Sequence, residues 1–164
     1  MPYWIPTGTP LQLATAARPH GGNRLEDEIR SLHREGVDVL VSLLTDDENQ
    51  ELELTQEGAL CRAAGMEVRS FPIPDRETPE SKEKFLRFIE SLGKEADAGL
   101  RIVLHCRAGI GRSSLVAAAL MVRAGFTADD AFDRISKARG HRVPDTGEQI
   151  DWIKHLGPLL RDKV

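Results

Sequence analysis

Short apolar runs alternate with longer amphipathic segments along this 164-residue sequence. Val37 to Leu44 and Arg101 to His105 are nearly continuous apolar runs, as a strand that is covered on both faces requires. Leu25 to Glu35 instead places its apolar residues at helical spacing. Strands that alternate with helices favour parallel pairing through helical crossovers. The sequence therefore predicts an α/β fold, with a central, mostly parallel sheet of about four to five strands flanked by helices.

The remaining segments continue this alternation. A further strand is predicted at Met66 to Ile73, and short extended segments are predicted at Tyr3 to Ile5 and Leu11 to Ala14. Further helices are predicted at Thr55 to Ala64, Ser81 to Ala96, Ser113 to Ala124, Ala128 to Arg139 and Thr146 to Leu160, the last interrupted near Gly157 and Pro158. No repeat, low-complexity tract or linker divides the chain, so we expect one domain over residues 1–164.

The charge balance limits the partners that the chain can have. It carries 26 acidic and 22 basic side chains, for a formal net charge of −4. Broad binding to nucleic acid or to an anionic membrane needs a basic surface, so any anion must be recognised locally. No stretch approaches the roughly 18 apolar residues of a membrane span, and the first residues lack the pattern of a signal peptide.

The chain has only two cysteines, Cys61 and Cys106. They are too few for a disulfide framework and lack the spacing of a zinc site. Cys61 falls in a predicted helix, where a cysteine usually serves as a small buried hydrophobic residue. We therefore expect a monomeric cytoplasmic protein in which chemistry falls to Cys106 alone.

The segment from His105 to Ser114 joins the predicted central strand to the following helix. A tight loop at this place lets successive backbone N–H groups converge, and the helix adds the positive end of its dipole. Gly109 and Gly111 permit the turn and a close approach of the backbone. The fork of Arg112 can hold two phosphate oxygens at once. The segment therefore predicts a site for phosphate or sulfate.

Cys106 lies at the centre of this predicted site. Its neighbours favour negative charge, so we expect a thiolate at neutral pH. A thiolate beside a held phosphoryl group is an in-line nucleophile, and the donors around it match the charge of the transition state. The expected product is a phosphocysteine. Ser113 is placed to donate a hydrogen bond to the sulfur and to help it leave in the second step.

The order of these residues resembles the signature of the protein tyrosine and dual-specificity phosphatase superfamily, which is His-Cys, five residues, Arg, then Ser or Thr. Here it reads His105-Cys106 to Arg112-Ser113. The resemblance extends along nearly the whole chain and looks closest to small bacterial-type dual-specificity phosphatases. It implies a cysteine phosphatase fold, a single catalytic domain over residues 1–164, a phosphorylated protein or peptide as substrate, and no cofactor or metal. Its expected substrate-binding loop consists of His105, Arg107, Ala108, Gly109, Ile110 and Gly111.

Two further segments fit the same family. Phosphatases of this kind carry a general acid on a separate loop, and Pro72 to Pro79 looks like that loop. The chemistry needs a carboxylic acid that protonates the leaving oxygen and then acts as base on water. Asp75 is the candidate, with Glu77 as the alternative. Val143 to Gln149 resembles a loop whose glutamine orients the hydrolytic water, which makes Gln149 the candidate for that role.

Other interpretations stay open at this point. A phosphatase of inositol lipids or of other small phosphate esters would share the fold, although the lipid enzymes often carry lysines where this loop has Arg107, Ala108 and Ile110. A phosphate-binding module without catalysis would be favoured if Cys106 or Arg112 were replaced, and both are present. A sulfurtransferase would also use a cysteine in such a loop.

Several polar residues near the predicted site have simple structural explanations. His105 is expected to shape the loop through a hydrogen bond near Cys106. The run Asp46-Asp47-Glu48 is expected to be a solvated loop that holds no metal. Arg76, Arg107, His141 and Arg142 are expected either to rim the site or to be ordinary surface charges.

Overall fold

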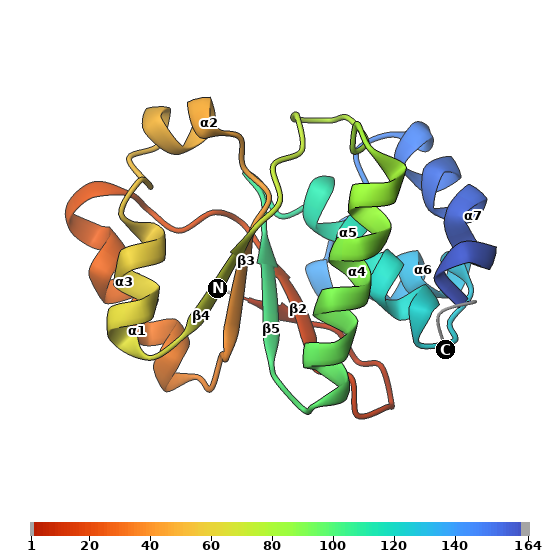
Figure 1. The fold of residues 1–164 in the computed structure, drawn as a ribbon, viewed down its shortest axis with the longest axis horizontal. Coiled ribbons are helices and arrows are strands. Elements are labelled where there is room, and N and C mark those ends of the chain that lie inside the picture. The colour runs from red at the N-terminus through yellow and green to blue at the C-terminus, as the bar shows by residue number, and fades with distance from the viewer. Residues whose placement is uncertain (1, 162–164) are drawn as a thin grey trace.

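The computed structural model describes residues 2–161 and contains a five-stranded sheet of order β1-β2-β5-β3-β4 (Figure 1). β1 pairs with β2 antiparallel, and the other neighbours are parallel. The predicted mostly parallel sheet is therefore confirmed. The strands are β1 Tyr3–Trp4, β2 Leu13–Ala16, β3 Val39–Ser42, β4 Glu67–Ser70 and β5 Ile102–His105.

Helices cover both faces of this sheet. α1 and α3 lie on one face, and α4, α5, α6 and α7 lie on the other (Figure 1). The fold class is thus α/β, as the alternation of segments predicted. The helices are α1 Leu25–Arg34, α2 Asp46–Glu51, α3 Glu57–Ala64, α4 Lys82–Asp97, α5 Arg112–Arg123, α6 Ala128–Arg139 and α7 Gly147–Arg161, with a 3₁₀ turn at Gly22–Arg24.

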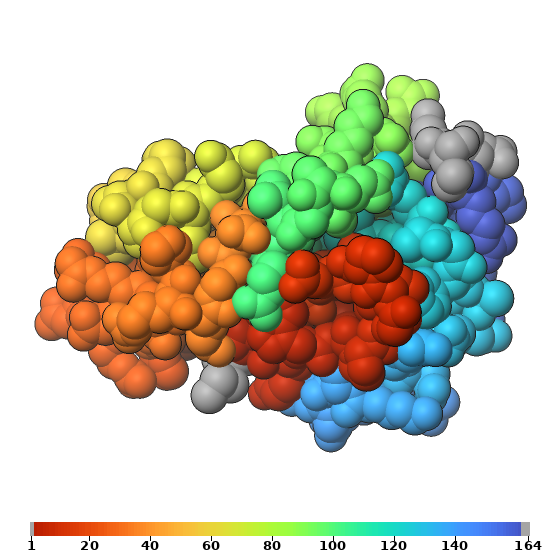
Figure 2. Space-filling model, turned by 90° about the horizontal axis from the view of Figure 1, so that it is seen from below, coloured from red at the N-terminus to blue at the C-terminus, as the bar shows by residue number. Residues whose placement is uncertain are grey.

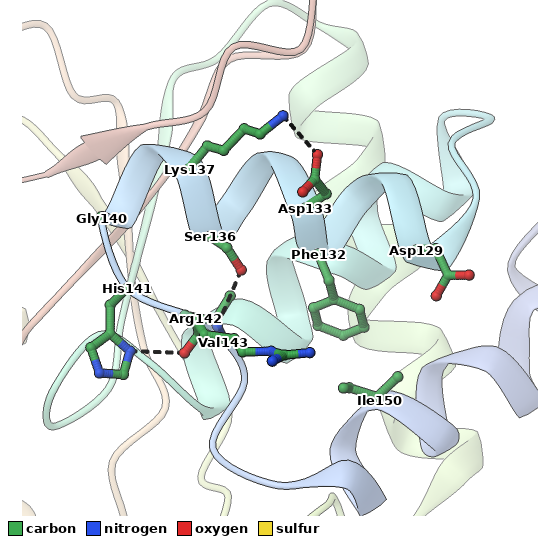
Figure 3. A pocket seen from close by; sticks show the side chains of 10 residues that line it. All are labelled: Asp129, Phe132, Asp133, Ser136, Lys137, Gly140, His141, Arg142, Val143 and Ile150. Atoms are coloured by element: carbon green, nitrogen blue, oxygen red, sulfur yellow. Dashed lines mark hydrogen bonds and ion pairs between the residues drawn. The ribbon is translucent and has the colours of Figure 1, made fainter.

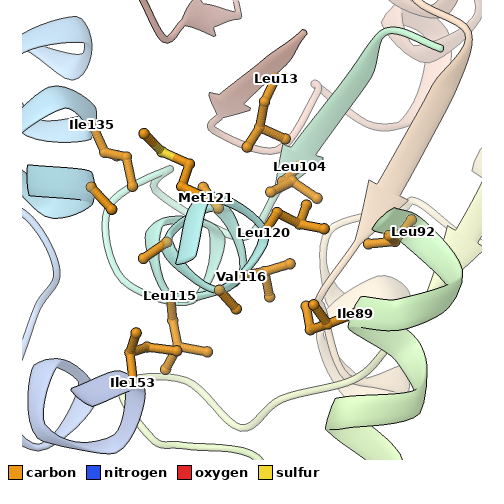
Figure 4. Packing of buried hydrophobic residues seen from close by; sticks show 14 of the residues in the cluster. Leu13, Ile89, Leu92, Leu104, Leu115, Val116, Leu120, Met121, Ile135 and Ile153 are labelled. Atoms are coloured by element: carbon orange, nitrogen blue, oxygen red, sulfur yellow. The ribbon is translucent and has the colours of Figure 1, made fainter. Parts of the chain in front are cut away.

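The two central strands are buried along their whole length. Successive side chains of a strand point to opposite faces, so Val103 packs toward α1 and α3 while Leu104 packs toward α5. α5 is buried from Arg112 to Val122 and lies among side chains from β2, β5, α4, α6 and α7 (Figure 4). The loop between β5 and α5 therefore has rigid elements at both of its ends.

The acidic run after β3 is not a solvated loop, so that prediction was wrong. Asp46, Asp47 and Glu48 form the first turn of α2, and Thr45 caps it. The Thr45 hydroxyl accepts from the Glu48 N–H, and the Glu48 carboxylate accepts from the Thr45 N–H at 3.1 Å. This reciprocal capping box and the helix dipole favour acidic residues at a helix start. The pattern Thr-x-x-Glu was the signal that the charge argument overlooked.

Among the boundaries that differ from the predictions, those of β2 and α7 bear most on the fold. β2 covers Leu13–Ala16 rather than Leu11 to Ala14. α7 continues through Gly157 and Pro158 to Arg161, with no interruption there. Leu156, Gly157 and Leu160 are buried, so packing on this face favours the helix although the proline removes one backbone donor.

The helices of residues 2–161 include none that combines the length and the apolar character of a membrane span.

Candidate active site

Three segments that follow parallel strands meet at one edge of the sheet. Ser42 of β3 is in register with Ser70 of β4 and with His105 of β5, so the three strands end together. The segments that follow them are α2, residues 71–81 and the loop of residues 106–111 (Figure 1). Ligands of open α/β sheets bind at the carboxyl ends of the strands.

Cys106 follows β5 directly and is 2% exposed. Its Sγ lies 3.3 Å from the Oγ of Ser113, which is fully buried in the first turn of α5. As a thiol, Cys106 donates to this hydroxyl. Once the sulfur is ionised it can only accept, so the Ser113 hydroxyl then donates to it.

Arg112 is the residue on which the surrounding segments converge. Its guanidinium is 1% exposed and makes a bidentate ion pair with Glu48, with Nη1–Oε1 at 2.6 Å and Nη2–Oε2 at 2.9 Å. Nη1 also donates to the Ile73 carbonyl at 2.9 Å, and Nη2 donates to Asp75 Oδ1 at 3.2 Å. Arg112 thus joins α5 to α2 and to the segment after β4.

The ion pair fixes the charge of both partners. Burial by itself would lower the pKa of Arg112, but the hydrogen bonds that it donates to Glu48 and the charges of Cys106, Glu48 and Asp75 outweigh burial and raise it. Burial would likewise raise the pKa of Glu48, but its bonds with Arg112 and Thr45 lower it overall. Sequence reasoning missed Glu48 because its partner lies 64 residues away.

The structure places both acid candidates on the predicted loop, in different surroundings. The Asp75 carboxylate is half exposed and touches Arg112. Glu77 is exposed, and its backbone carbonyl accepts from Gln149 Nε2 at 3.1 Å. Gln149 is fully buried, and its Oε1 accepts from the N–H groups of Asp145 and Thr146. Gln149 therefore ties the start of α7 to the loop that carries Asp75.

Both glycines of the loop lie against neighbouring atoms, and at Gly109 these are backbone atoms that leave no room for a side chain. Gly109 has φ +73°, and a Cβ added there would lie 2.7 Å from the backbone carbon of Ala16. A Cβ on Gly111 would overlap the Asp145 carboxylate. Together with Ala108 and Ile110, these residues form the turn between Cys106 and Arg112. The loop thus approaches β2 on one side and the start of α7 on the other.

His105 has hydrogen-bond partners on both sides of its ring. Nδ1 lies 3.2 Å from the Cys106 carbonyl oxygen, and Nε2 lies 2.8 Å from Glu57 Oε2. His105 and Glu57 are both buried. The sequence pointed to the first contact but not to Glu57, which comes from α3 on the other side of β5. His105 is therefore held in place from two directions.

The basic residues expected near the site have separate surroundings. The Arg107 guanidinium lies beside α2, with Nη2 3.5 Å from Glu51 Oε1 and Nη1 3.9 Å from Glu48 Oε2. His141 and Arg142 line a hollow between α6 and the start of α7, where Val143 donates its N–H to the Ser136 hydroxyl (Figure 3).

The second cysteine has no chemistry of this kind around it. Cys61 is fully buried on α3, as predicted. Burial and the charge of Glu57 raise the pKa of its thiol to about 12. Among residues 2–161, no group of three or more His, Cys, Asp or Glu side chains is arranged to hold a metal ion.

Comparisons with known sequences identify relatives over much of the chain. Residues 14–126 match the family model Tc-R-P, described as "Polymorphic toxin system, DSP-PTPase phosphatase". "Dual specificity protein phosphatase 2" of Mus musculus is 30% identical over 94 residues, 57% of this chain and 27% of the mouse protein. "Putative tyrosine phosphatase 197R" of Invertebrate iridescent virus 6 is 28% identical over 163 residues, 94% of this chain and 56% of the viral protein. The chain thus spans between about a quarter and about half of the length of these relatives.

Solved structures share the fold. Kinase associated phosphatase, crystallised with its catalytic cysteine replaced by serine, superposes with a TM-score of 0.87 at 20% identity, over 98% of this chain and 95% of that one. The active form of Tk-PTP gives a TM-score of 0.75 at 26% identity, over 90% and 92% of the two chains. PTPMT1 in complex with PI(5)P gives a TM-score of 0.74 at 17% identity, over 93% of this chain and 94% of that one. The predicted cysteine phosphatase fold is confirmed.

Proposed function

The chain belongs to the DSP-PTPase phosphatase family of polymorphic toxin systems, and from this premise we propose that it hydrolyses phosphate monoesters through a phosphocysteine intermediate. The observation that carries the proposal is the convergence of Cys106, Arg112 and Asp75, which come from two different segments, at one edge of the sheet. Nucleophile, phosphate clamp and proton donor are the three groups that such a reaction needs.

The donors of Arg112 define where the substrate phosphate binds. A guanidinium has five N–H groups. Nη1 gives its two to Glu48 and to the Ile73 carbonyl, with the Leu43 carbonyl as a longer third acceptor at 3.5 Å, and Nη2 gives one to Glu48 and one to Asp75. The edge left for a bidentate phosphate is therefore Nε together with the Nη2 hydrogen that Asp75 accepts. Phosphate would displace Asp75 from this hydrogen and leave its carboxyl group beside the leaving oxygen.

The first chemical step transfers the phosphoryl group to the protein. The Cys106 thiolate attacks phosphorus in line, an S–P bond forms, and the P–O bond to the leaving group breaks. Asp75 gives its proton to the departing oxygen. Backbone N–H groups of residues 107–111 and the Arg112 fork hold the three phosphoryl oxygens, whose charge is spread in the transition state.

The second step returns the enzyme to its starting state. The Asp75 carboxylate takes a proton from water, the water oxygen attacks phosphorus, and the S–P bond breaks. Ser113 donates its hydrogen bond to the departing sulfur, from 3.3 Å away in the free protein. Gln149 is the proposed guide of this water, a role that requires Nε2 to release the Glu77 carbonyl, since its Oε1 is held by Asp145 and Thr146.

The experiment that tests the proposal is hydrolysis of p-nitrophenyl phosphate without added metal. Cys106→Ser should abolish turnover, and Cys61→Ala, which changes the other buried cysteine, should keep it. Phosphate binding by the wild type without turnover would favour the non-catalytic module. Undiminished turnover in Cys106→Ser would refute the phosphocysteine mechanism.

We propose phosphorylated proteins or peptides, with phosphotyrosine first, as the substrates. Arg107 is the cationic side chain of the loop outside the clamp, and the carboxylates of Glu48 and Glu51 lie beside it. Its charge is thus largely offset, which disfavours a polyanionic inositol headgroup. The fold shared with PTPMT1 keeps the lipid as the second candidate. Turnover rates on phosphotyrosine, phosphothreonine and inositol-lipid substrates would distinguish the two.

We also propose that the protein is monomeric and cytoplasmic; its two free, buried cysteines fit a reducing compartment and support the second point. Light scattering on the purified chain tests the first point, and fractionation of the producing cells tests the second.

A further inference from the structure

The carbonyl groups of the phosphate-binding loop have partners on the surrounding protein. Cys106 and Gly109 are buried, so their backbone groups need protein partners, whereas Arg107 and Ala108 are exposed. Two of the carbonyls share one side chain, the guanidinium of Arg139. The five contacts are Leu43 N–H to His105 O at 3.0 Å, His105 Nδ1 with Cys106 O at 3.2 Å, Arg18 N–H to Arg107 O at 3.2 Å, Arg139 Nη2 to Ala108 O at 3.2 Å and Arg139 Nε to Gly109 O at 3.2 Å.

These contacts decide where the N–H groups of the loop point. In a planar trans peptide unit the C=O group and the next N–H group point in opposite directions. A carbonyl held against the protein body therefore turns the following N–H toward the concave side of the loop. By holding the carbonyls of Ala108 and Gly109, Arg139 orients the N–H groups of Gly109 and Ile110.

Gly109 is where the loop needs such a partner most. It joins the two peptide units that Arg139 holds, and its φ is +73°. Because glycine lacks a Cβ, either peptide unit can rotate there at little cost. A rotated unit would present a carbonyl oxygen to the phosphate in place of an N–H group, and it would repel the anion.

Arg139 is itself held in place by the N-terminal strand. It is the last residue of α6, which packs on α5. Its guanidinium carbon lies 4.5 Å from the centre of the Tyr3 ring, in β1, which is a cation–π distance. In Figure 2 the red N-terminal segment lies against the blue part of the chain that contains the end of α6. Tyr3 and Arg139 both lie outside residues 14–126, which match the family model.

We infer that Arg139, held by Tyr3, is a positioning residue that keeps the Ala108–Ile110 backbone in its anion-binding conformation. The inference rests on the proposed function, because it assumes that this loop binds the substrate phosphate. Arg139 acts through the backbone of the loop and needs no contact with the substrate.

The test measures binding of inorganic phosphate, as the inhibition constant against p-nitrophenyl phosphate. Apparent affinity falls with the fraction of molecules in the binding conformation. Arg139→Met removes both hydrogen bonds and should weaken phosphate binding by about tenfold, the equivalent of 1.4 kcal/mol. Arg139→Lys keeps the charge but cannot bridge two carbonyls in the same way, so it should stay at least fivefold weaker than wild type. Full rescue by lysine would show that charge alone matters and would overturn the inference.

Arg134 offers a matched control on the same helix. It also donates to a backbone carbonyl, that of Pro6 at 2.8 Å, and its guanidinium carbon lies 5.2 Å from the centre of the Phe126 ring. Arg134→Met should therefore cost similar stability but leave phosphate affinity within about twofold of wild type. Equal losses of phosphate affinity in Arg134→Met and Arg139→Met would mean that the affinity follows the general stability of the protein, and this would overturn the inference.

The part played by Tyr3 is tested by a double-mutant cycle. Tyr3→Leu should weaken phosphate binding less than Arg139→Met, and the double variant should be no weaker than Arg139→Met alone. Additive losses would refute action through Arg139. If Cys106→Ser keeps full turnover, the proposed function fails. If Cys106→Ser is inactive but Arg139→Met binds phosphate as tightly as wild type, this inference fails and the proposed function stands.

Discussion

The pair between Glu48 and Arg112 yields the most direct prediction. Glu48→Gln keeps the side-chain shape and one acceptor but leaves the Arg112 charge, 1% exposed, with only the half-exposed Asp75 as counter-ion. Breaking a buried ion pair from one side costs about 3–5 kcal/mol, and the remaining amide oxygen favours the lower end. At roughly 2–4 °C per kcal/mol for a chain of this size, the melting temperature should fall by about 6–12 °C. Calorimetry measures this directly.

A neighbouring glutamate supplies the control. Glu51 lies on the same helix but is 64% exposed and reaches only Arg107, at 3.5 Å. Glu51→Gln should therefore change the unfolding free energy by less than about 0.5 kcal/mol. If Glu48→Gln were equally neutral in stability and in turnover, Glu48 would have no role in holding Arg112.

The same pair predicts a dependence on pH. The pKa of Glu48 in the folded protein lies below its ordinary value of 4.5. The carboxylate therefore stabilises the fold above that ordinary value, and this contribution is lost as the pH falls through the lowered pKa. The stability difference between wild type and Glu48→Gln should be full at pH 7 and shrink below about pH 4.5. A difference that is constant down to pH 3 would contradict the charge argument.

Other substitutions separate the steps of the reaction. Asp75→Asn should lower kcat for phosphopeptides by about 10²-fold or more and affect p-nitrophenyl phosphate much less, because p-nitrophenolate leaves without a proton; a comparable loss in Glu77→Gln alone would transfer the acid role. Ser113→Ala should slow the second step, so that phosphocysteine accumulates and rapid-quench kinetics show a burst; a first step slowed by the same factor would argue against help to the leaving sulfur. Gly109→Ala places a Cβ 2.7 Å from the backbone of Ala16 at positive φ and should abolish phosphate binding, as titration calorimetry would show.

The sequence sufficed where the chemistry is contiguous. Cys106, Arg112 and Ser113 lie within one strand-loop-helix unit, as expected, and their residue types, spacing and place after a strand predict a phosphate site. The alternation of apolar and amphipathic segments likewise predicted the sheet and its helices. Helix periodicity and strand composition are local properties, so no knowledge of distant contacts was needed.

The residues that the sequence did not reveal act across long separations. Glu48 meets Arg112 across 64 residues, Glu57 meets His105 across 48, and Arg139 meets Gly109 across 30. Glu57 and Arg139 fall on predicted helices and Glu48 fell in a predicted loop. Charged residues in both places are normally solvated, so each had a simpler explanation at its own position. Only the strand order, with β5 between β2 and β3, brings these partners together.

The position of Asp75 in the free protein explains how an acid remains ready beside an anion site. Its carboxylate accepts the Nη2 hydrogen of Arg112 at 3.2 Å, on the edge that we assign to the phosphate. In the proposed mechanism, an incoming dianion competes for that hydrogen and repels the carboxylate, so Asp75 moves away from the guanidinium. This movement takes a negative charge away from the arginine and leaves Asp75 beside the leaving oxygen. Glu48 is not displaced, because it is buried and is held by Thr45 as well as by Arg112. We therefore propose different roles for the two carboxylates on one guanidinium: Glu48 holds Arg112, and Asp75 yields its place to the substrate.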